Sequence, residues 1–399
     1  MKRLLKVSFD LALLSLIPVL SWFALGLLVD KNLINVFTLT YPIQFIWYIH
    51  KSIFSTGANI SKEKDKNKNA TMSGIVIGSI VGFIVFGLIA LNIDNYITFM
   101  NMDINIYHNF AIYSVIQLYI QLVFNFYIEK LYFEDKNTLA NKYSFGFNLI
   151  NFFVLILTSL IFNNHFLIII ITLISILIYV LVVAIRESNR FRLELKMLNY
   201  IKYDSVELFN NVAFFFIFLF GLSNVLEFGV EYATALTFVA LITDTQWDVF
   251  TAITVVAKID ISRNNFNYKE HRNNAYKLLG ILIGSIIIMA MLLFNNYNLN
   301  IGITLTFLGF EIANFFMTPV YKIKTCFLQL EYSALKTTIN KMIASTSRFA
   351  FSFLKSPYCT GIGQVFSSVY QFISINLIFN NNYKINTDGS VLKRQRSNK

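Results

Sequence analysis

The sequence predicts an all-α polytopic membrane protein with twelve transmembrane helices, arranged as two parallel six-helix repeats that form two lobes around a central cavity. Three observations predict this fold class. Hydrophobic residues make up 56% of the chain and charged residues only 14%, whereas a soluble domain carries about 25% charged residues. The basic residues alternate between the connections of twelve apolar stretches, and one short motif occurs twice, about half a chain apart.

The apolar stretches are each long enough for a helix to cross the hydrocarbon core of a bilayer, which takes about 20 residues. The first follows the basic segment MKRLLK, and no small-residue cleavage site comes after it, so we expect an uncleaved helix and not a secretory signal. The twelve stretches are 10–30, 32–55, 73–92, 106–128, 143–162, 165–185, 205–223, 232–256, 274–294, 299–321, 338–354 and 361–379.

The basic residues predict the orientation of these helices. Of the 33 lysines and arginines, we place only Lys31 and Lys355 in odd-numbered connections, and the others in even-numbered connections, at the termini or at adjoining helix ends. Basic residues stay on the cytoplasmic side of a membrane. We therefore expect a multi-pass protein of the bacterial plasma (inner) membrane, with both termini in the cytoplasm. The net charge of +11 is explained by the membrane, so we expect no nucleic acid partner.

The repeated motif is GIVIGSI at 74–80, which recurs as GILIGSI at 280–286. The segment NISK at 59–62 precedes the first copy, and DISR at 260–263 precedes the second. In both loops the dipeptide Asn-Ala closes the connection. The match in context indicates a duplication of six helices. Because six is an even number, both halves enter the membrane in the same orientation, as in transporters with parallel repeats.

The repeat predicts the domain boundaries. We expect an N-terminal six-helix lobe at 1–200, whose end at about 186–202 is a basic linker, and a C-terminal six-helix lobe at 201–383. Residues 384–399 are polar and basic, which predicts a disordered cytoplasmic tail near anionic lipid headgroups. Two such lobes can rock about a central cavity. A rigid scaffold left by an ancient duplication is the alternative.

The stretch 232–256 contains the segment TDTQWD, with two acidic residues inside a predicted span. Charges in a bilayer are costly and mark ion or substrate paths. Asp244 and Asp248 are four residues apart and share one helix face. The pair can exchange a proton or hold a cation with its oxygen atoms. Trp247 lies beside them, and we expect its ring face to contact a substrate cation.

The stretch 299–321 carries a third acid, Glu311, near its centre. Asn314 continues the same helix face. The argument from the cost of a buried charge applies here as well, so we expect both residues at a coupling-ion or substrate site. The competing interpretation, here and for the TDTQWD segment, is a polar stripe that neighbouring helices satisfy.

Three further polar residues are candidates for the same site. Glu207 lies near the cytoplasmic end of its span, where a charge at headgroup level is the alternative. Asp30 lies at the outer end of the first span, where a simple helix-end charge competes with a functional role. Gln44 shares a face of the second span with Trp47 and Lys51, and these side chains either line the cavity or hydrogen-bond neighbouring helices.

Other classes of protein lack support in the sequence. It contains no HExxH, no GxSxG and no nucleophile paired with a base, so we expect no enzyme. Nothing indicates the ring of filter groups of a channel. Cys326 and Cys359 fall on opposite sides of the predicted membrane, and the four histidines share no ligand-like spacing, so we expect no disulfide, metal or cofactor.

Two segments are similar to those of a known family. GANISKEKDKNKNA at 57–70 looks like a Gly-Ala motif followed by a charged loop. SLIPVL, with Pro18, and LLVDK, with Asp30, look like a first helix in which a proline is followed by an acid before a short outer turn. With these motifs and the twelve predicted spans, the chain resembles the multidrug and toxic compound extrusion (MATE) transporters of the MOP flippase superfamily over nearly its whole length.

The resemblance implies a role for the predicted acids. Asp30 would correspond to the family's acid in the N-terminal lobe, and the acids of the eighth and tenth spans to its C-terminal cation site. It implies multidrug efflux, in which organic, cationic small molecules are exported by alternating access as H⁺ or Na⁺ flows inward. Apart from these solutes and the lipid bilayer we expect no partner, and a monomer.

A flippase of the same superfamily, moving lipid-linked or polysaccharide precursors, is the nearest alternative. Such a carrier needs lysine or arginine inside its cavity to bind an anionic substrate. The membrane-embedded charges of this sequence are mostly acids, with Lys51 as an exception. A scaffold that transports nothing stays open, although it would give the embedded acids no reason to tolerate desolvation.

Overall fold

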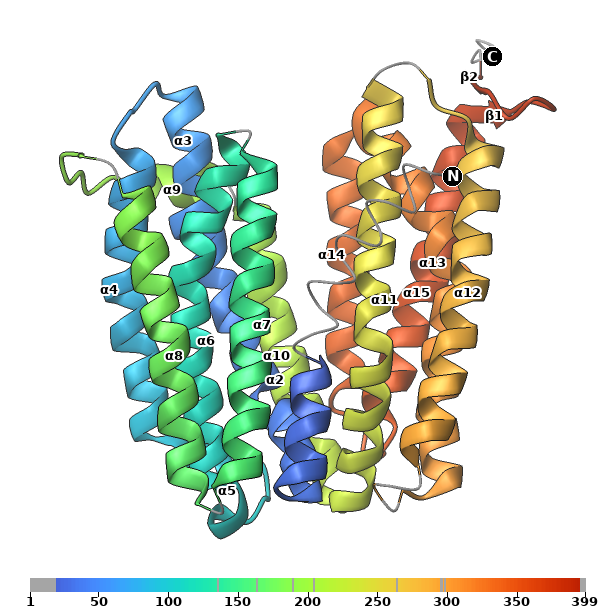
Figure 1. The fold of residues 1–399 in the computed structure, drawn as a ribbon. Helices are drawn as coiled ribbons and strands as arrows, with labels where there is room; N and C mark the ends of the chain where they lie inside the picture. The colour runs from blue at the N-terminus through green and yellow to red at the C-terminus, as the bar shows by residue number, and fades with distance from the viewer. Residues whose placement is uncertain are drawn as a thin grey trace. The chain divides into compact units, whose positions relative to one another are not determined.

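In a computed structural model of the chain, the structure describes residues 19–134, 136–162, 164–188, 190–203, 205–262, 265–294, 297 and 299–394. At some positions inside these ranges, among them 205–207 and 244–249, the description covers the backbone only. Almost all of the described chain is helical, as Figure 1 shows.

Seven helices in the described part are long and apolar enough to cross a membrane. Their mean hydropathy ranges from 1.3 to 3.3 over the most apolar window, so each contains a segment that can lie in hydrocarbon. They are α4 (Ala70–Leu91), α6 (Ile104–Phe133), α7 (Asn137–Ile161), α8 (His165–Glu187), α12 (Tyr268–Phe294), α13 (Ile301–Glu331) and α15 (Cys359–Asn382).

The other five predicted spans are helical as well, although they are shorter or more polar. The first is described from residue 19 and continues to residue 28. The rest are α2 (Asn35–Lys51), α10 (Ser205–Glu227), α11 (Val230–Ser262) and α14 (Ala334–Phe351). Every one of the twelve predicted spans therefore contains a helix, and the prediction of an all-α polytopic membrane protein is confirmed.

The structure also contains short elements that the sequence did not predict. Between the first span and α2 lies the 3₁₀ helix η1 (Lys31–Ile34), and after α2 come the π-helical segment η2 (Ser52–Gly57) and α3 (Ala58–Lys64). Helix α5 (Ile93–Phe99) precedes α6, and α9 (Met197–Tyr203) lies in the predicted linker. Two strands, β1 (Tyr383–Ile385) and β2 (Val391–Lys393), form an antiparallel hairpin near the C-terminus.

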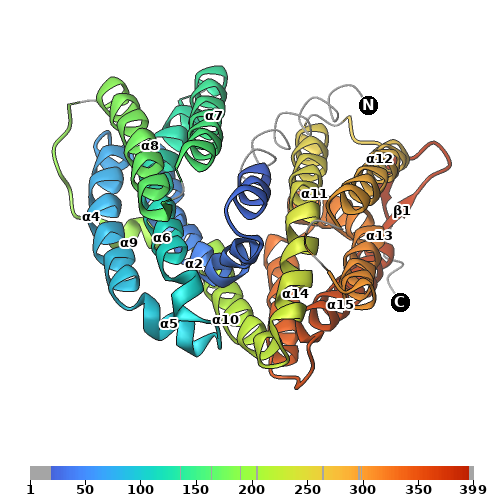
Figure 2. The same cartoon turned by 60° about the horizontal axis from the view of Figure 1, so that its bottom comes forward.

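The contacts between helices divide the chain into two compact units, one built from Leu20–Thr234 and one from Ala235–Lys399. In the first, α6 packs against α2, α4, α7 and α8, and α10 packs against α2. In the second, α15 packs against both α13 and α14, and the three helices run side by side in Figures 1 and 2. The lobe boundary between residues 200 and 201, which the repeat predicts, stays a prediction.

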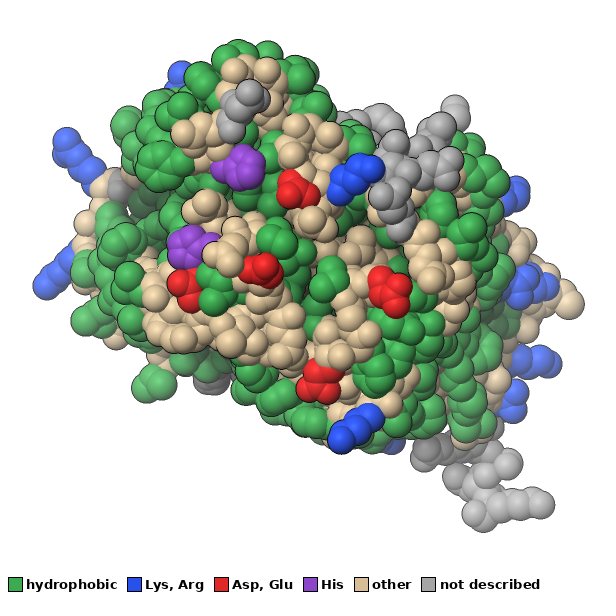
Figure 3. Space-filling model, turned by 90° about the horizontal axis from the view of Figure 1, so that it is seen from below, with side chains coloured by type: hydrophobic (Ala, Val, Ile, Leu, Met, Phe, Trp, Pro, Cys, Tyr) green, Lys and Arg blue, Asp and Glu red, His purple; other side chains and the backbone are tan. Residues whose placement is uncertain are grey.

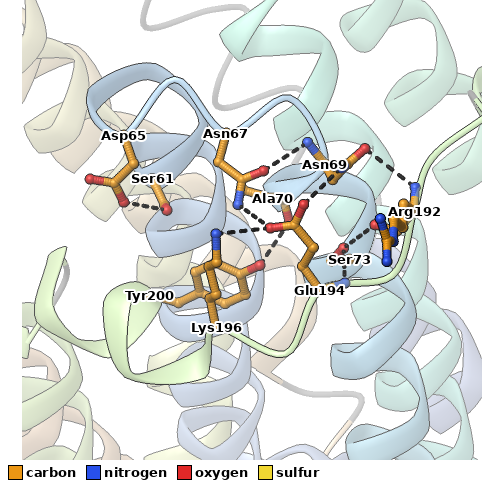
Figure 4. Close-up of polar contacts among 10 residues, drawn as sticks. All are labelled: Ser61, Asp65, Asn67, Asn69, Ala70, Ser73, Arg192, Glu194, Lys196 and Tyr200. Carbon is orange, nitrogen blue, oxygen red and sulfur yellow. Dashed lines mark hydrogen bonds and ion pairs between the residues drawn. The ribbon is translucent and has the colours of Figure 1, made fainter.

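The linker after α8 is docked on the first unit by a cluster of polar contacts around Glu194, shown in Figure 4. The Glu194 carboxylate accepts hydrogen bonds from the side-chain amides of Asn67 and Asn69, at 2.9 and 2.8 Å, and pairs with Lys196 at 3.1 Å. The bond from Asn69, with the contribution of Lys196, lowers the pKa of the carboxyl. Residues 192–196 are therefore fixed to the loop between α3 and α4.

A glycine permits the close approach of the linker helix α9 to the π-helical segment η2. A Cβ atom on Gly57 would lie 2.3 Å from the backbone oxygen of Tyr200, which no side chain can tolerate. The buried Tyr200 donates its hydroxyl to the backbone oxygen of Ala70 at 3.3 Å, at the start of α4. The Gly-Ala segment of the sequence is thus the place where α9 contacts the π-helical end of the second span.

The C-terminal hairpin makes a corresponding contact in the second unit. Asn267 and Lys269, beside the start of α12, donate side-chain hydrogen bonds of 2.8 and 2.7 Å to the backbone oxygens of Asp388 and Thr387 in the turn. Gly389 forms this turn with φ +90°, a conformation that favours glycine. The expectation of a disordered tail is wrong for residues 384–394, because backbone and side-chain hydrogen bonds hold them on the loop between α11 and α12.

Each unit thus carries the same kind of clasp. The segment that follows the sixth span binds the loop between the second and third, and the segment that follows the twelfth binds the loop between the eighth and ninth. We call these segments the linker clasp (residues 190–203) and the hairpin clasp (residues 383–394). The shared arrangement extends the sequence repeat to the connections at one end of the helices.

The opposite end of the helices is rich in acidic side chains. Figure 3 views this end and shows Asp, Glu and His side chains on it, with most of the visible lysines and arginines around its margin. Asp94, in α5, and Asp103, just before α6, are exposed, and Asp94 pairs with His108 at 2.5 Å. This distribution is what the predicted orientation requires of the outer end, and the orientation itself stays a prediction.

Candidate functional site

The TDTQWD segment lies in α11, which runs through it without a break. The side chains of Asp244, Trp247 and Asp248 lie outside the described residues, as does that of Glu207 in α10. The predicted pairing of the two aspartates on one face, and the roles of Trp247 and Glu207, therefore stay predictions.

Asp30 is exposed at the end of the first span. Its carboxylate accepts the backbone N–H of Asn32 at 2.8 Å and caps the 3₁₀ helix η1. A capping carboxylate satisfies a backbone donor that the start of a helix leaves without a partner. The geometry is that of the helix-end interpretation, and a role in ion coupling stays a prediction.

Lys51, the basic residue on the polar face of the second span, is neutralised within the first unit. Its Nζ lies 2.9 Å from Glu129 Oε1 in α6 and 5.5 Å from the ring centroid of Trp47. The hydroxyl of Thr56, in the π-helical segment, donates to the other carboxylate oxygen at 3.1 Å. Gln44 is half-buried two turns before Lys51 on α2. This direct ion pair leaves Lys51 poorly suited to bind an anionic substrate.

The second unit contains a different arrangement of charges around Glu311. The Nε2 of Gln364, in α15, donates to both carboxylate oxygens of Glu311 at 3.0 Å. The Oε1 of the same amide accepts a hydrogen bond of 3.2 Å from Arg348 Nη2 in α14. Gln364 is only 9% exposed, and Glu311 and Arg348 are half-buried. Three helices thus meet at a carboxylate and a guanidinium that one amide bridges. We call these three residues the bridged triad.

Two glycines bring α15 close enough for the amide to reach both neighbours. A Cβ atom on Gly361 would lie 2.3 Å from the ring of Phe310, the residue before Glu311. A Cβ atom on Gly363 would lie 2.9 Å from Cβ of Phe351 at the end of α14. Small residues at helix interfaces allow backbones to approach closely. The segment TGIGQ therefore places Gln364 at the point where α13 and α14 are both within hydrogen-bonding distance.

Asn314 lies one helical turn beyond Glu311 and is 1% exposed. Its Oδ1 accepts the hydroxyl of Ser368, in α15, and lies 3.5 Å from the hydroxyl of Thr318. Its Nδ2 has no hydrogen-bond partner in the described part of the chain. The polar face that the sequence predicted on this span is thus packed against α15, and it retains one buried donor near the triad.

Sequence reasoning missed two members of the triad. The sequence-based orientation assigns Arg348 to a cytoplasmic helix end, whereas it lies in the last turn of α14, beside the odd-numbered connection 352–358. Arg348 therefore has to be added to Lys31 and Lys355 as a basic residue near the odd-numbered connections. The sequence signal that could have identified Arg348 was its position as a charged residue inside the predicted span 338–354. Gln364 is neutral, and only the flanking glycines of TGIGQ could have indicated a close helix contact there.

Comparison with known proteins gives matches among solved structures alone: no protein-family model matches the sequence, and no curated protein does. An inward-facing conformation of a multidrug resistance MATE family transporter of the MOP superfamily aligns with a TM-score of 0.67 at 12% identity, covering 92% of this chain and 95% of that one. The chain has the MATE fold. The twelve-helix architecture and the resemblance seen in the sequence are thereby confirmed at the level of the fold.

Other MATE structures align over the same extent. An outward-facing conformation of a multidrug resistance MATE family transporter gives a TM-score of 0.59, and a MATE in complex with MaD3S gives 0.61. Each is 14% identical and covers 95% of this chain and 96% of the other. Within this MATE fold, the bridged triad lies among α13, α14 and α15, and the Lys51–Glu129 pair lies between α2 and α6.

Proposed function

We propose that the protein is an antiporter that exports organic, cationic small molecules across the membrane by alternating access, driven by an inward flow of H⁺ or Na⁺. The observation that carries the proposal is a carboxylate, Glu311, held inside the helices of a MATE fold. The matched structures are transporters solved in inward-facing and outward-facing conformations, which supports alternating access. A carboxylate in such a position is costly, which supports a place on an ion path.

Glu311 is suited to bind cations in turn. Within the described residues, its two oxygens accept hydrogen bonds from one amide nitrogen, and the side chain is half-buried, so a proton or Na⁺ can compete for them. When the coupling ion binds, the carboxylate loses its attraction for an organic cation, which leaves on the outer side. After the lobes rock inward, the ion dissociates and the carboxylate attracts the next substrate.

The remaining candidates extend this site in the proposal. Asp244 and Asp248 supply further carboxylates for the coupling ion, and the ring of Trp247 faces the organic cation. Asn314 offers a polar group on the face of Glu311. Asp30, Glu207 and Gln44 are proposed as contributors on the ion or substrate path. A monomer in the plasma membrane suffices for this mechanism, because one chain carries both repeats.

A flippase for lipid-linked precursors is the less favoured function. It would require an accessible basic residue for an anionic headgroup. Lys51 is paired with Glu129 at 2.9 Å, and Arg348 is held by Gln364 at 3.2 Å next to an acid. Lys51 and Arg348 therefore each lie near a negative charge of the protein itself.

The test is ethidium movement in proteoliposomes under an imposed proton gradient and, separately, a sodium gradient. We expect one gradient to drive ethidium out of its starting compartment with the unchanged protein, and Glu311→Gln to lose that movement while remaining folded. Glu331→Gln is the matched control, because it changes an exposed acid at the other end of α13. Full movement with Glu311→Gln contradicts the role of Glu311, and no movement with either gradient contradicts cation-coupled export.

A further inference from the structure

We propose that Arg348 is a built-in counter-cation of Glu311, which the coupling ion or the organic cation replaces through the movement of Gln364. The proposal rests on the proposed function, since it assigns a regulator to the same carboxylate. It names Arg348 and Gln364 as positioning residues that set how tightly Glu311 holds a cation.

The position of Arg348 requires a compensating partner. Inside a bilayer, an arginine costs about 2.5–3.5 kcal/mol at the centre of a helix and less near its ends. Under the predicted orientation, Arg348 lies toward the outer side, where the preference of basic residues for the cytoplasmic side does not explain it. The hydrogen bond to Gln364, and through it the negative charge of Glu311, supplies a reason for a guanidinium at this place.

The chemistry of the amide fixes its orientation. An amide has one acceptor end and one donor end. The acceptor oxygen faces the guanidinium and the donor nitrogen faces the carboxylate. Reversal would place two donors together at Arg348 and two acceptors together at Glu311, so only the observed orientation satisfies both. The amide dipole is therefore aligned between the two charges, and it transmits the effect of Arg348 to Glu311 without a direct contact.

A bound cation competes with this arrangement in two ways. It needs the same carboxylate oxygens that accept Gln364 Nε2, so the amide has to withdraw from at least one of them. It also meets the positive charge of Arg348 close by, in surroundings of low dielectric constant where like charges repel more strongly than in water. Both effects weaken cation binding at Glu311. The carboxylate is thereby set to release each cation and to accept one at a time.

The test measures the cation concentration that gives half-maximal ethidium export in proteoliposomes, with whichever of H⁺ or Na⁺ drives the unchanged protein. We expect Arg348→Gln to lower this concentration about tenfold, because the repulsion and the alignment of the bridge are both lost. Arg348→Lys keeps the charge and should stay within about threefold of the unchanged protein. Lys336→Gln, at the exposed start of α14, is the matched control and should leave the concentration unchanged.

A second measurement does not depend on transport. Ethidium binding to the purified protein is followed by fluorescence at equilibrium, where we expect Arg348→Gln and Gln364→Leu each to bind about tenfold more tightly. Glu311→Gln/Arg348→Gln removes both charges together, so it should fold and lose the tightened binding. A role confined to charge balance and stability would lower the melting temperature of Arg348→Gln and leave both affinities where they are.

The outcomes separate this proposal from the proposed function. If Glu311→Gln abolishes coupled export while Arg348→Gln changes neither the half-maximal cation concentration nor the ethidium affinity, the counter-cation role is overturned and the antiporter stands. If Glu311→Gln retains full coupled export, the proposed role of Glu311 fails. Tighter ethidium binding by Arg348→Gln in purified protein would still support a counter-cation in that case.

Discussion

In the described part of each compact unit, one embedded glutamate is associated with a basic residue from another helix, and the two associations differ. In the first, Lys51 touches Glu129 directly at 2.9 Å, Thr56 occupies the second carboxylate oxygen, and Trp47 covers the ammonium. In the second, Gln364 stands between Arg348 and Glu311. The first pair has its charges and oxygens satisfied by fixed partners, which makes it a lock between helices. In the second, both carboxylate oxygens accept hydrogen bonds from the same amide nitrogen, and we propose that a cation can displace this amide.

Local structure explains the difference. The π-helical segment after Lys51 inserts Thr56 where it can reach Glu129, and π segments often occur at functional sites. In the second unit no such segment interrupts α13 in the described chain, and close packing at two glycines inserts an amide between the charges. A similar pair of charges thus forms a structural tie in one unit, and in the other it forms the cation site that we propose.

Breaking the direct pair should give the largest loss of stability. Glu129→Ala leaves Lys51 without its counter-charge, and removing one partner of a buried pair costs about 3–5 kcal/mol. Both side chains are partly exposed, at 28% and 17%, so we expect about 1–3 kcal/mol here. Thermal unfolding in detergent measures the change, with the exposed acid variant Glu227→Ala as control. Equal melting temperatures for both variants would contradict the lock.

Widening the contact beside the triad should have a similar or smaller effect on stability and a specific effect on coupling. Gly361→Ala places a Cβ atom 2.3 Å from the ring of Phe310, and overpacking costs about 1–3 kcal/mol. Because α15 has to shift, we expect Gln364 to lose one of its partners and gradient-driven ethidium export to fall. Gly309→Ala is the matched control on α13, since nothing lies within 4 Å of its Cβ position. A coupled export rate unchanged in Gly361→Ala would contradict the geometric argument.

The spans and the embedded acid of the candidate site could be predicted from the sequence, whereas the contacts between helices could not. The twelve spans could be predicted because the length of an apolar stretch is a local property of the sequence. Glu311 could be identified as a candidate because charged residues are rare inside such stretches. The Gln364 bridge could not be predicted from the sequence, because Gln364 is neutral and its partners lie on two other helices. The clasps were missed for the same reason. Short elements such as α9 and the hairpin form because tertiary contacts fix them, and composition alone predicted a linker and a disordered tail.

The smallest predicted effect concerns the linker clasp and its pH dependence. The pKa of Glu194 is lowered by the bond from Asn69 and by Lys196. The ionised carboxylate therefore stabilises the docked linker clasp above the unfolded-state pKa, and this stabilisation is lost as the pH falls through the lower folded-state pKa. We expect a spin label on Arg190→Cys to become more mobile as the pH falls from 7 to about 3. Adding Glu194→Gln should make the label mobile already at pH 7. A label whose mobility is the same in both proteins at every pH would contradict docking through Glu194.

The central claim is that the bridged carboxylate, and not the directly paired one, exchanges cations. The most direct measurement is equilibrium binding of ethidium to purified protein carrying Glu311→Gln or Glu129→Gln, compared with the unchanged protein. The account predicts that Glu311→Gln lowers the affinity at least tenfold, while Glu129→Gln leaves it within about twofold. Loss of binding in Glu129→Gln with full binding in Glu311→Gln would contradict it.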